Sequence, residues 1–420
     1  MSVVAARPYR IGSLTIARHR VSGLAYIGVA ALIVALFGTV VPGSQSEFNL
    51  NTSGVALTLP SVVVPSQPII WGLAGVCAFL GAIQLTRGFG ARRAVILGSV
   101  VLMVVLAFLV WSASGRSMNL VGVLQATVQR ATPLTFAALS GVLCERAGVV
   151  NIAIEGMLLT GAFVSAVVGS AFGPWVGILG AALAGGALAW VLAVLAIRYR
   201  VDQIIAGTVI NIFATGITAF LSSRVLTEVP KLNAPERLSA LPIPILNDIP
   251  VIGPILFTNN VFVYGMFALV CLLHVGLFKT QWGLRVRAVG EHPKAADTMG
   301  IDVLRTRYIN VILGGMVAGV GGAFLVIGAT GRFDKDMTAG RGFIGLAAMI
   351  FGAWTPIGSF LASLVFGFAD SLQARLSVLN VPIPSEILLM VPYVVTIFVV
   401  AGLVGRSRAP AADGRPYTKD

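Results

Sequence analysis

A series of long apolar runs, recurring along nearly the whole chain of 420 residues, is the feature that most restricts how this sequence can fold. A helix needs roughly 20 apolar residues to cross the hydrocarbon core of a bilayer, and about twelve runs approach that length. Lipid offers the backbone no hydrogen-bond partners, so each spanning run must bond its own N–H and C=O groups as a helix. Only 11% of the residues are charged and the mean hydropathy is +0.93, which excludes a water-soluble domain of this size.

These runs predict an all-α, polytopic integral membrane protein with about 10–12 transmembrane segments, and the lipid bilayer is its first predicted partner. Two regions interrupt apolar sequence with proline, amides or glycines, and we expect broken or half helices there: residues 119–172 and residues 340–354. The run Tyr308–Ala329 carries several glycines, which permit close contact between helices.

The distribution of charge predicts how the chain is threaded through the membrane. Basic residues outnumber acidic ones by 29 to 16, and they lie in short clusters at the ends of apolar runs. A nucleic-acid-binding protein would gather them on one folded face, so we expect no nucleic-acid partner. Cytoplasmic loops carry the excess of Lys and Arg. Because basic clusters flank the first and the last runs, both termini are predicted to be cytoplasmic.

Three parts follow from this arrangement. Residues 1–118 hold a cytoplasmic N-terminus and three leading transmembrane helices, residues 119–405 form the main membrane core, and residues 406–420 form a cytoplasmic tail that we expect to be disordered. The core contains an external, proline-rich loop at 224–260 and a charged cytoplasmic segment at 279–307. The external loop is predicted to be either a small cap or docking surface, or a disordered connector, and both interpretations stay open.

Five polar residues within or beside apolar runs are candidates to line a path for a polar solute. A charge at mid-membrane costs about 2.5–3.5 kcal/mol on insertion scales, so such groups must be paired, protonated or in contact with water. For Glu155, pairing with Arg146 or Arg130 is the simpler alternative, and asparagines also join helices by hydrogen bonds. Asp202 and Asp370 are predicted to form ion pairs at the membrane surface. The candidates for the solute path are Gln125, Gln129, Asn151, Glu155 and Asn211.

No set of residues suited to catalysis or metal binding appears in the sequence. It lacks the G-x-x-x-x-G-K-[ST] phosphate loop, the H-E-x-x-H and C-x-x-C patterns and the nucleophile elbow. The three cysteines and three histidines are scattered, without the spacing of metal ligands. We therefore expect no catalytic residues, no metal, no cofactor and no enzyme activity of the chain itself.

A charged segment between two apolar runs carries the most specific pattern in the chain. From Gly283 to Ile301 it follows G-L-R-x-R-A-x-G-E-x-P-x-A-A-x-x-x-G-I. We expect one short cytoplasmic helix here, ended by Gly300, with Ala295 and Ala296 on a small face that docks in a groove of a partner. The segment resembles the coupling segment of permease subunits of bacterial ABC importers in the branched-chain amino acid, simple-sugar and nucleoside group. The residues that carry this resemblance are Gly283, Arg285, Arg287, Gly290, Glu291, Pro293, Ala295, Ala296 and Gly300.

Two further stretches resemble the nucleoside branch of this group. Thr132–Met157 ends in E-R-A-G-V-V-N-I-A-I-E-G-M, and Val201–Asn211 reads V-D-Q-I-I-A-G-T-V-I-N. The resemblance implies a permease subunit in the bacterial plasma membrane that carries nucleosides into the cytoplasm. It also implies three protein partners: a cytoplasmic ATP-binding subunit with two fused nucleotide-binding domains, a second permease in a heterodimer, and an external substrate-binding lipoprotein.

Two other functions stay open at this point. The same group includes permeases for simple sugars, so a sugar is the alternative substrate. An ion-coupled secondary transporter would instead carry its coupling ions on Glu155 and Asp370 near the middle of the membrane. Uptake by the isolated chain in vesicles with an ion gradient would favour that function, whereas co-purification with an ATP-binding subunit would favour an ABC importer.

Overall fold

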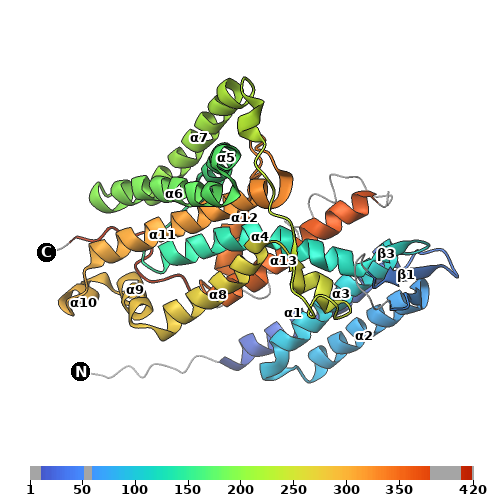
Figure 1. Cartoon of the computed structure of the whole chain (residues 1–420). Coiled ribbons are helices and arrows are strands. Elements are labelled where there is room, and N and C mark those ends of the chain that lie inside the picture. Colours follow the sequence, from blue (N-terminus) through green and yellow to red (C-terminus); the bar gives the residue numbers. More distant parts are fainter. Residues whose placement is uncertain (1–10, 52–58, 379–407, 419–420) are drawn as a thin grey trace, which may run out of the picture. The chain divides into compact units, whose positions relative to one another are not determined.

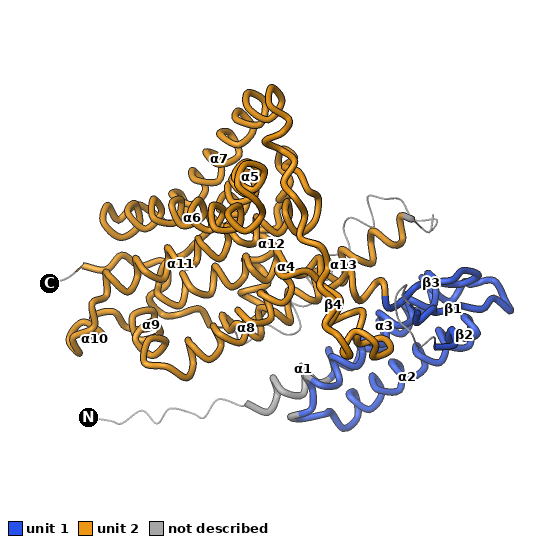
Figure 2. Tube along the Cα trace, viewed as in Figure 1, with its two compact units in different colours: residues 1–121 blue, residues 122–420 orange. Residues whose placement is uncertain are grey.

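The computed structural model describes residues 11–51, 59–378 and 408–418, in which most elements are helices (Figure 1). The all-α membrane architecture expected from the apolar runs is therefore confirmed. The chain divides into two compact units, residues 1–121 and residues 122–420 (Figure 2). The predicted last apolar run, at 385–403, lies outside the described residues.

Unit 1 consists of three long helices and a small β-sheet in the described residues. The central strand β1 pairs antiparallel with β2 and parallel with β3. Ser46 of β1 donates a hydrogen bond to the Val110 carbonyl at 2.6 Å, which joins the sheet to the end of α3. The bounds are α1 (Ile11–Phe37), β1 (Gln45–Asn49), β2 (Val62–Pro65), α2 (Ser66–Thr86), α3 (Arg93–Ser112) and β3 (Ser117–Asn119).

Unit 2 contains the remaining long helices of the described chain. Three of them end in a π-helical turn: α6 at Val194–Arg198, α7 at Ser222–Leu226 and α11 at Phe324–Thr330. The bounds are α4 (Leu120–Glu145), α5 (Ile154–Phe172), α6 (Pro174–Ala193), α7 (Gln203–Leu221), α8 (Val261–Lys279), α9 (Gln281–Glu291), α10 (Pro293–Thr298), α11 (Val303–Ala323), α12 (Arg341–Phe351) and α13 (Pro356–Val378).

Glycines allow α5, α6 and α11 to form the centre of unit 2. A Cβ atom at Gly319 of α11 would lie 2.1 Å from the Ala181 carbonyl oxygen of α6. A Cβ atom at Gly322 would lie 2.0 Å from the Leu158 carbonyl oxygen of α5. Helices in lipid associate by close packing of small residues, because no hydrophobic effect drives them together there. The glycines of the run Tyr308–Ala329 thus serve the helix contacts predicted for them.

Nine helices in the described part of the chain are long and apolar enough to cross a bilayer. The apolar helix α12 has 11 residues and is about 16 Å long, so it reaches only partway across. This confirms the half helix predicted at residues 340–354. The half helix predicted within residues 119–172 is wrong, because α4 has 26 residues and α5 has 19.

Helix α4 continues through Pro133, although proline removes one backbone hydrogen bond, the one to the Gln129 carbonyl. Transmembrane helices tolerate such a loss where neighbouring groups satisfy the backbone. Threonine hydroxyls in this stretch do bond to it: Thr132 donates to the Val128 carbonyl at 2.9 Å. The irregular backbone lies instead between α4 and α5, at residues 146–153, and we call these residues the α4–α5 turn.

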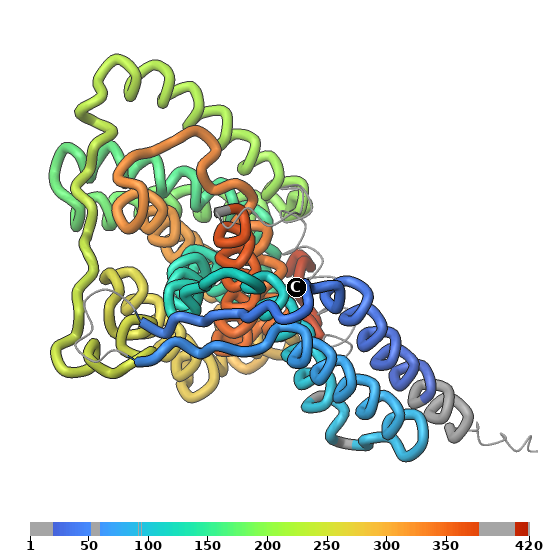
Figure 3. Tube along the Cα trace, turned by 90° about the vertical axis from the view of Figure 1, so that its right-hand side faces the viewer, coloured from blue at the N-terminus to red at the C-terminus, as the bar shows by residue number. Residues whose placement is uncertain are grey.

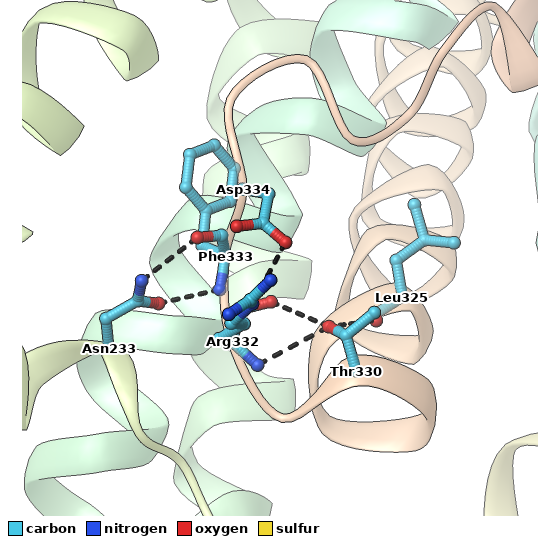
Figure 4. A network of polar contacts seen from close by, with 6 residues as sticks. All are labelled: Asn233, Leu325, Thr330, Arg332, Phe333 and Asp334. Atoms are coloured by element: carbon cyan, nitrogen blue, oxygen red, sulfur yellow. Dashed lines mark hydrogen bonds and ion pairs between the residues drawn. The ribbon is translucent and has the colours of Figure 1, made fainter.

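The loop at 224–260 is ordered, which excludes the disordered connector. It forms a short antiparallel pair, β4 (Leu241–Pro242) with β5 (Thr258–Asn259), and extends along one side of unit 2 (Figure 3). The Asn233 side chain both donates to the Phe333 carbonyl at 2.9 Å and accepts from the Phe333 N–H at 2.6 Å (Figure 4). Phe333 is only 2% exposed and packs edge-on against Phe163 of α5. The loop is therefore fastened to the connection between α11 and α12.

The tail prediction is also corrected. Residues 408–418 are ordered and pack against α9, α10 and α11, with Tyr417 buried beside Val289, Ala296 and Val303. Composition had indicated disorder because these residues include few large apolar side chains. A single buried tyrosine and backbone hydrogen bonds nevertheless hold the segment in place.

Candidate functional site

The α4–α5 turn is buried although its backbone is not helical, so each of its polar groups needs a partner. Helix α7 supplies side chains that bond to it. Gln203 accepts a hydrogen bond from the Val150 N–H at 2.7 Å. Asn211 donates to the Ile152 carbonyl at 2.8 Å and accepts from the Gly156 N–H at 2.8 Å, at the start of α5. These amides hold the turn and cap α5.

Glu155 lies in the first turn of α5 and is 8% exposed. Its two carboxylate oxygens accept hydrogen bonds from backbone N–H groups at the start of α12, from Gly340 at 2.8 Å and from Gly342 at 2.5 Å. The first N–H groups of a helix lack partners within the helix and favour a negative charge. Glu155 therefore caps the half helix α12 from the neighbouring helix α5.

Pairing of Glu155 with Arg146 or Arg130, the simpler alternative expected from the sequence, is wrong. Arg146 donates to the carbonyls of Trp354 at 2.8 Å and Ala353 at 3.2 Å, just beyond the end of α12. Arg130 forms an ion pair with Asp370 of α13 at 2.7 Å. These arginines are close to Glu155 in the sequence. In the folded chain, however, the Glu155 carboxylate meets the first N–H groups of α12 instead.

Helix α12 is thus held at both ends by groups from the α4–α5 region. Glu155 bonds to its first N–H groups, and Arg146 bonds to carbonyls just past its last residue. The Trp354 indole N–H also donates to the Glu145 carboxylate at 2.5 Å. An anion at the N-terminus and a cation at the C-terminus are the charges that a helix dipole favours.

Only three of the five predicted path residues meet. Asn151, Glu155 and Asn211 lie in or against the stretch from the α4–α5 turn to the start of α5. Asn151 is fully buried, its Nδ2 lies 3.4 Å from the Cys144 sulfur, and its Oδ1 has no hydrogen-bond partner among the described residues. Gln125 lies 20 residues before the end of α4, about 30 Å away along the helix, and donates to the Thr258 carbonyl of the loop at 224–260.

Gln129 lies on an exposed face of α4, one turn after Gln125. Asp370 forms the ion pair expected for it, with Arg130 as its partner. Asp202 does not form one in the described residues, because its carboxylate instead accepts the N–H groups of Ile204 and Ile205 as the N-cap of α7. Gln203 was missed, although a glutamine directly after a helix N-cap in apolar sequence could have indicated it.

The predicted coupling helix is two helices, α9 and α10, which meet at His292 and Pro293. His292 has φ −147° and ψ 81°, and its ring accepts the Ala295 N–H, so α9 ends and a new helix begins with Pro293. Ala295 and Ala296 do not share one exposed face, since Ala296 is buried while Ala295 is exposed. Gly300 adopts φ +79° and ends the segment as predicted.

Two glycines bring α9 against the rest of unit 2. A Cβ atom at Gly283 would lie 2.2 Å from the Gly276 carbonyl oxygen of α8, and one at Gly290 would lie 2.2 Å from the Arg146 carbonyl oxygen. The Arg287 guanidinium lies 5.1 Å from the centre of the Phe278 ring. Glu291 accepts the Ala411 N–H of the tail at 3.2 Å. Helix α9 therefore contacts the α4–α5 turn directly.

The outer face of α9 and α10 is exposed, and it includes two large apolar side chains. Leu284 is 61% exposed and Met299 is 81% exposed, beside the exposed Arg285 and Lys294. Apolar side chains within a charged, water-facing segment are typical of a surface that binds another protein. We call Leu284 and Met299 the apolar pair of the coupling segment. The sequence pattern did not single them out, because exposure is decided by the fold.

Replacing Asn211 by leucine is expected to destabilise the chain. The substitution removes a donor and an acceptor, which leaves the Ile152 carbonyl and the Gly156 N–H without partners, at about 1–3 kcal/mol for each buried group. Thermal unfolding in detergent, followed by size-exclusion chromatography, should occur at a clearly lower temperature. Replacing the exposed Thr215 of the same helix by valine is the matched control, and equal stability of the two variants would contradict the capping role.

The sequence of this chain matches a known protein family. The family described as "Branched-chain amino acid transport system / permease component" matches residues 123–400. The guanosine ABC transporter permease protein NupQ of Bacillus subtilis is 42% identical over 71% of this chain and 96% of its own length. The nucleoside ABC transporter permease protein NupC of Lactococcus lactis is 43% identical over 72% of this chain and 99% of its own.

A more distant relative, the putative glucose ABC transporter permease protein TsgC13 of Haloferax volcanii, is 36% identical over 60% of this chain and 77% of its own length. No solved structure matches. The matched region holds the capped helix α12, the α4–α5 turn and the coupling segment, whereas residues 1–122 and 401–420 lie outside the family match. The chain belongs to the family of permease components of branched-chain amino acid transport systems.

Proposed function

We propose that this chain is the transmembrane permease subunit of an ATP-binding cassette importer that carries nucleosides into the cytoplasm. The observation that carries the proposal is 42–43% identity to guanosine and nucleoside permeases over nearly their whole length. The absence of a phosphate loop from the sequence agrees with a subunit that transports and leaves ATP hydrolysis to a partner.

Three protein partners belong to this proposal. A cytoplasmic ATP-binding subunit, with two fused nucleotide-binding domains, would dock on α9 and α10 through the apolar pair. A second, different permease would complete the pore. Bacillus subtilis has a second guanosine ABC transporter permease protein, NupP, that is also similar to this chain, which supports a heterodimer. An external lipoprotein would deliver the solute.

The contacts around α12 supply a route from the ATPase to the membrane interior. Helix α9 touches the backbone of Arg146 through Gly290, and the Arg146 side chain bonds to the carbonyls that follow α12. Glu155 joins the other end of α12 to α5. A shift of α9 would therefore move a half helix that ends inside the membrane. The partner's ATP cycle would favour one of two arrangements of these contacts.

Orientation is the remaining part of the proposal. We place the chain in the bacterial cytoplasmic membrane with both termini inside, because basic clusters flank its first and last apolar runs. The contact between residues 408–418 and α9–α10 supports this placement for the C-terminus, since both then lie on one side of the membrane.

The deciding experiment measures uptake. A bacterial strain without nucleoside uptake would express the chain with the ATPase, permease and lipoprotein encoded beside it. Radiolabelled guanosine should accumulate, and a catalytically dead ATPase should abolish accumulation. Accumulation of glucose without guanosine would favour the sugar alternative, for which the similarity to TsgC13 is the basis. Ion-driven uptake by this chain alone in vesicles would replace the proposal by a secondary transporter, although the ion pair of Asp370 with Arg130 disfavours it.

A further inference from the structure

The ordered C-terminal segment, residues 408–418, joins two parts of the coupling region. On one side, the Ala412 N–H donates to the Gly290 carbonyl at 2.9 Å and the Ala411 N–H to Glu291 at 3.2 Å, at the end of α9. On the other side, a Cβ atom at Gly148 of the α4–α5 turn would lie 3.2 Å from the Ala412 carbonyl oxygen. The segment therefore bridges α9 and the α4–α5 turn, which are the first two members of the route from the ATPase to α12.

Helix α11 anchors the far end of the segment. Arg307 is 1% exposed and donates through Nη1 to the Arg415 carbonyl at 2.9 Å. Tyr417 is buried in the cluster with Val289, Ala296 and Val303, which belong to α9, α10 and α11. A segment outside the family match thus contacts α9, α10 and α11.

A pair of carboxyl groups lies at the centre of these contacts. The Asp413 side chain is hydrogen-bonded to that of Glu145, at the end of α4. Two ionised carboxylates cannot share a hydrogen bond, so one of them must hold a proton. The other Asp413 oxygen, Oδ1, is buried without a hydrogen-bond partner among the described residues. Glu145 also accepts the Trp354 indole N–H, so the same pair touches the end of α12.

We propose that residues 408–418 form a proton-sensitive strap that fastens α9 to the α4–α5 turn and loosens when Asp413 gives up its proton. The strap is a segment of this chain, and its docking does not depend on which solute is carried. Only its effect on the coupling of ATP hydrolysis to transport rests on the proposed function.

The direction of the pH dependence follows from the surroundings of Asp413. Burial raises the pKa of Asp413 from its ordinary 3.8 to about 6, although the hydrogen bond from Glu145 and the charge of Arg307 oppose the rise. Cys144 and Glu145 of α4, Arg307 of α11 and Tyr417 of the strap are the titratable groups that face this site. An acid whose pKa is raised in the docked state favours docking below its ordinary pKa. That preference is lost as the pH rises from about 4 to about 6.

Hydrogen exchange of the purified full chain tests the strap. The Ala411 and Ala412 amides should be protected at pH 4.5, and their protection, corrected for the intrinsic exchange rate, should fall by roughly 25-fold on the way to pH 7, as a shift of the Asp413 pKa from 3.8 to about 6 implies. In Asp413→Asn the side chain cannot ionise, so protection should stay high throughout this range. Asp334→Asn makes the same chemical change at an exposed aspartate of the connection between α11 and α12, and it should behave as the unmodified chain.

Tyr417→Ala should lower protection at every pH, because it removes the apolar anchor and leaves the carboxyl pair intact. Exchange of Ala411 and Ala412 at unprotected rates at all pH values would overturn the docked strap. Protection that does not change with pH in the unmodified chain, or changes equally in Asp413→Asn, would overturn its proton sensitivity. These outcomes need no transport, so failure of the nucleoside assay would leave them unaffected.

Discussion

Replacing Glu155 by glutamine is expected to lower uptake by the assembled transporter by about tenfold or more while the chain still inserts into the membrane. The carboxylate caps α12 through two backbone N–H groups, and glutamine keeps one acceptor oxygen and points an NH₂ group at a donor. Hydrogen bonds to charged groups contribute about 1.5–3 kcal/mol each. The initial rate of guanosine uptake, normalised to the amount of chain in the membrane, measures the effect.

Two further variants test whether the loss of uptake is specific to the Glu155 carboxylate. Glu236→Gln makes the same change at an exposed position of the loop at 224–260 and should retain full uptake. Glu155→Asp keeps the charge but is one methylene shorter, so we expect an intermediate rate. If Glu155→Gln transported at the unmodified rate and unfolded at the same temperature, the cap of α12 would have no part in transport.

The second large effect is expected at the apolar pair. Changing both Leu284 and Met299 to aspartate should prevent the ATP-binding subunit from co-purifying with the chain and should abolish uptake. Both side chains are exposed, at 61% and 81%, so the substitutions leave the packing of unit 2 intact. Central apolar side chains of an interface each contribute about 2 kcal/mol or more, so two of them correspond to roughly a thousandfold in affinity.

Leu241→Asp, at a leucine of the loop at 224–260 that is 52% exposed, is the matched control for this pair. It introduces the same charge at a position away from the coupling segment and should not affect co-purification. A complex that survived the double substitution with full uptake would place the ATPase contact elsewhere on the chain. The thermal unfolding temperature of each variant should be unchanged, which separates loss of binding from loss of folding.

Features that depend on a local sequence pattern were predicted, whereas features that depend on contacts between distant residues were not. The coupling segment could be located because a charged stretch between two apolar runs has to leave the lipid. Its division into α9 and α10 was missed, although His292 and Pro293 are a local signal for the start of a helix. The buried positions of Gly283 and Gly290 depend on contacts with α8 and the α4–α5 turn, and no pattern in the sequence indicates these contacts.

The partners of the predicted path residues could not be predicted from the sequence. Polar residues in apolar sequence do indicate places where backbone groups lack partners, and Asn211 and Glu155 both bond to such groups. Their partners are backbone groups of an irregular turn and of a half helix, and no sequence pattern states which helix end will approach which side chain. Their use as substrate contacts stays a prediction, while their use as caps is visible in the hydrogen bonds.

The sequence by itself determined the membrane class, the helical architecture and the position of the water-facing coupling segment. These properties depend on how each stretch of chain interacts with lipid or water, which its own composition states. Only the tertiary structure decided that Glu155 and Arg146 hold the two ends of α12, and that the final residues bind α9. Those pairings join residues up to 187 positions apart for Glu155 and 120 for Glu291. They depend on the packing of several helices at once, and no local pattern encodes that packing.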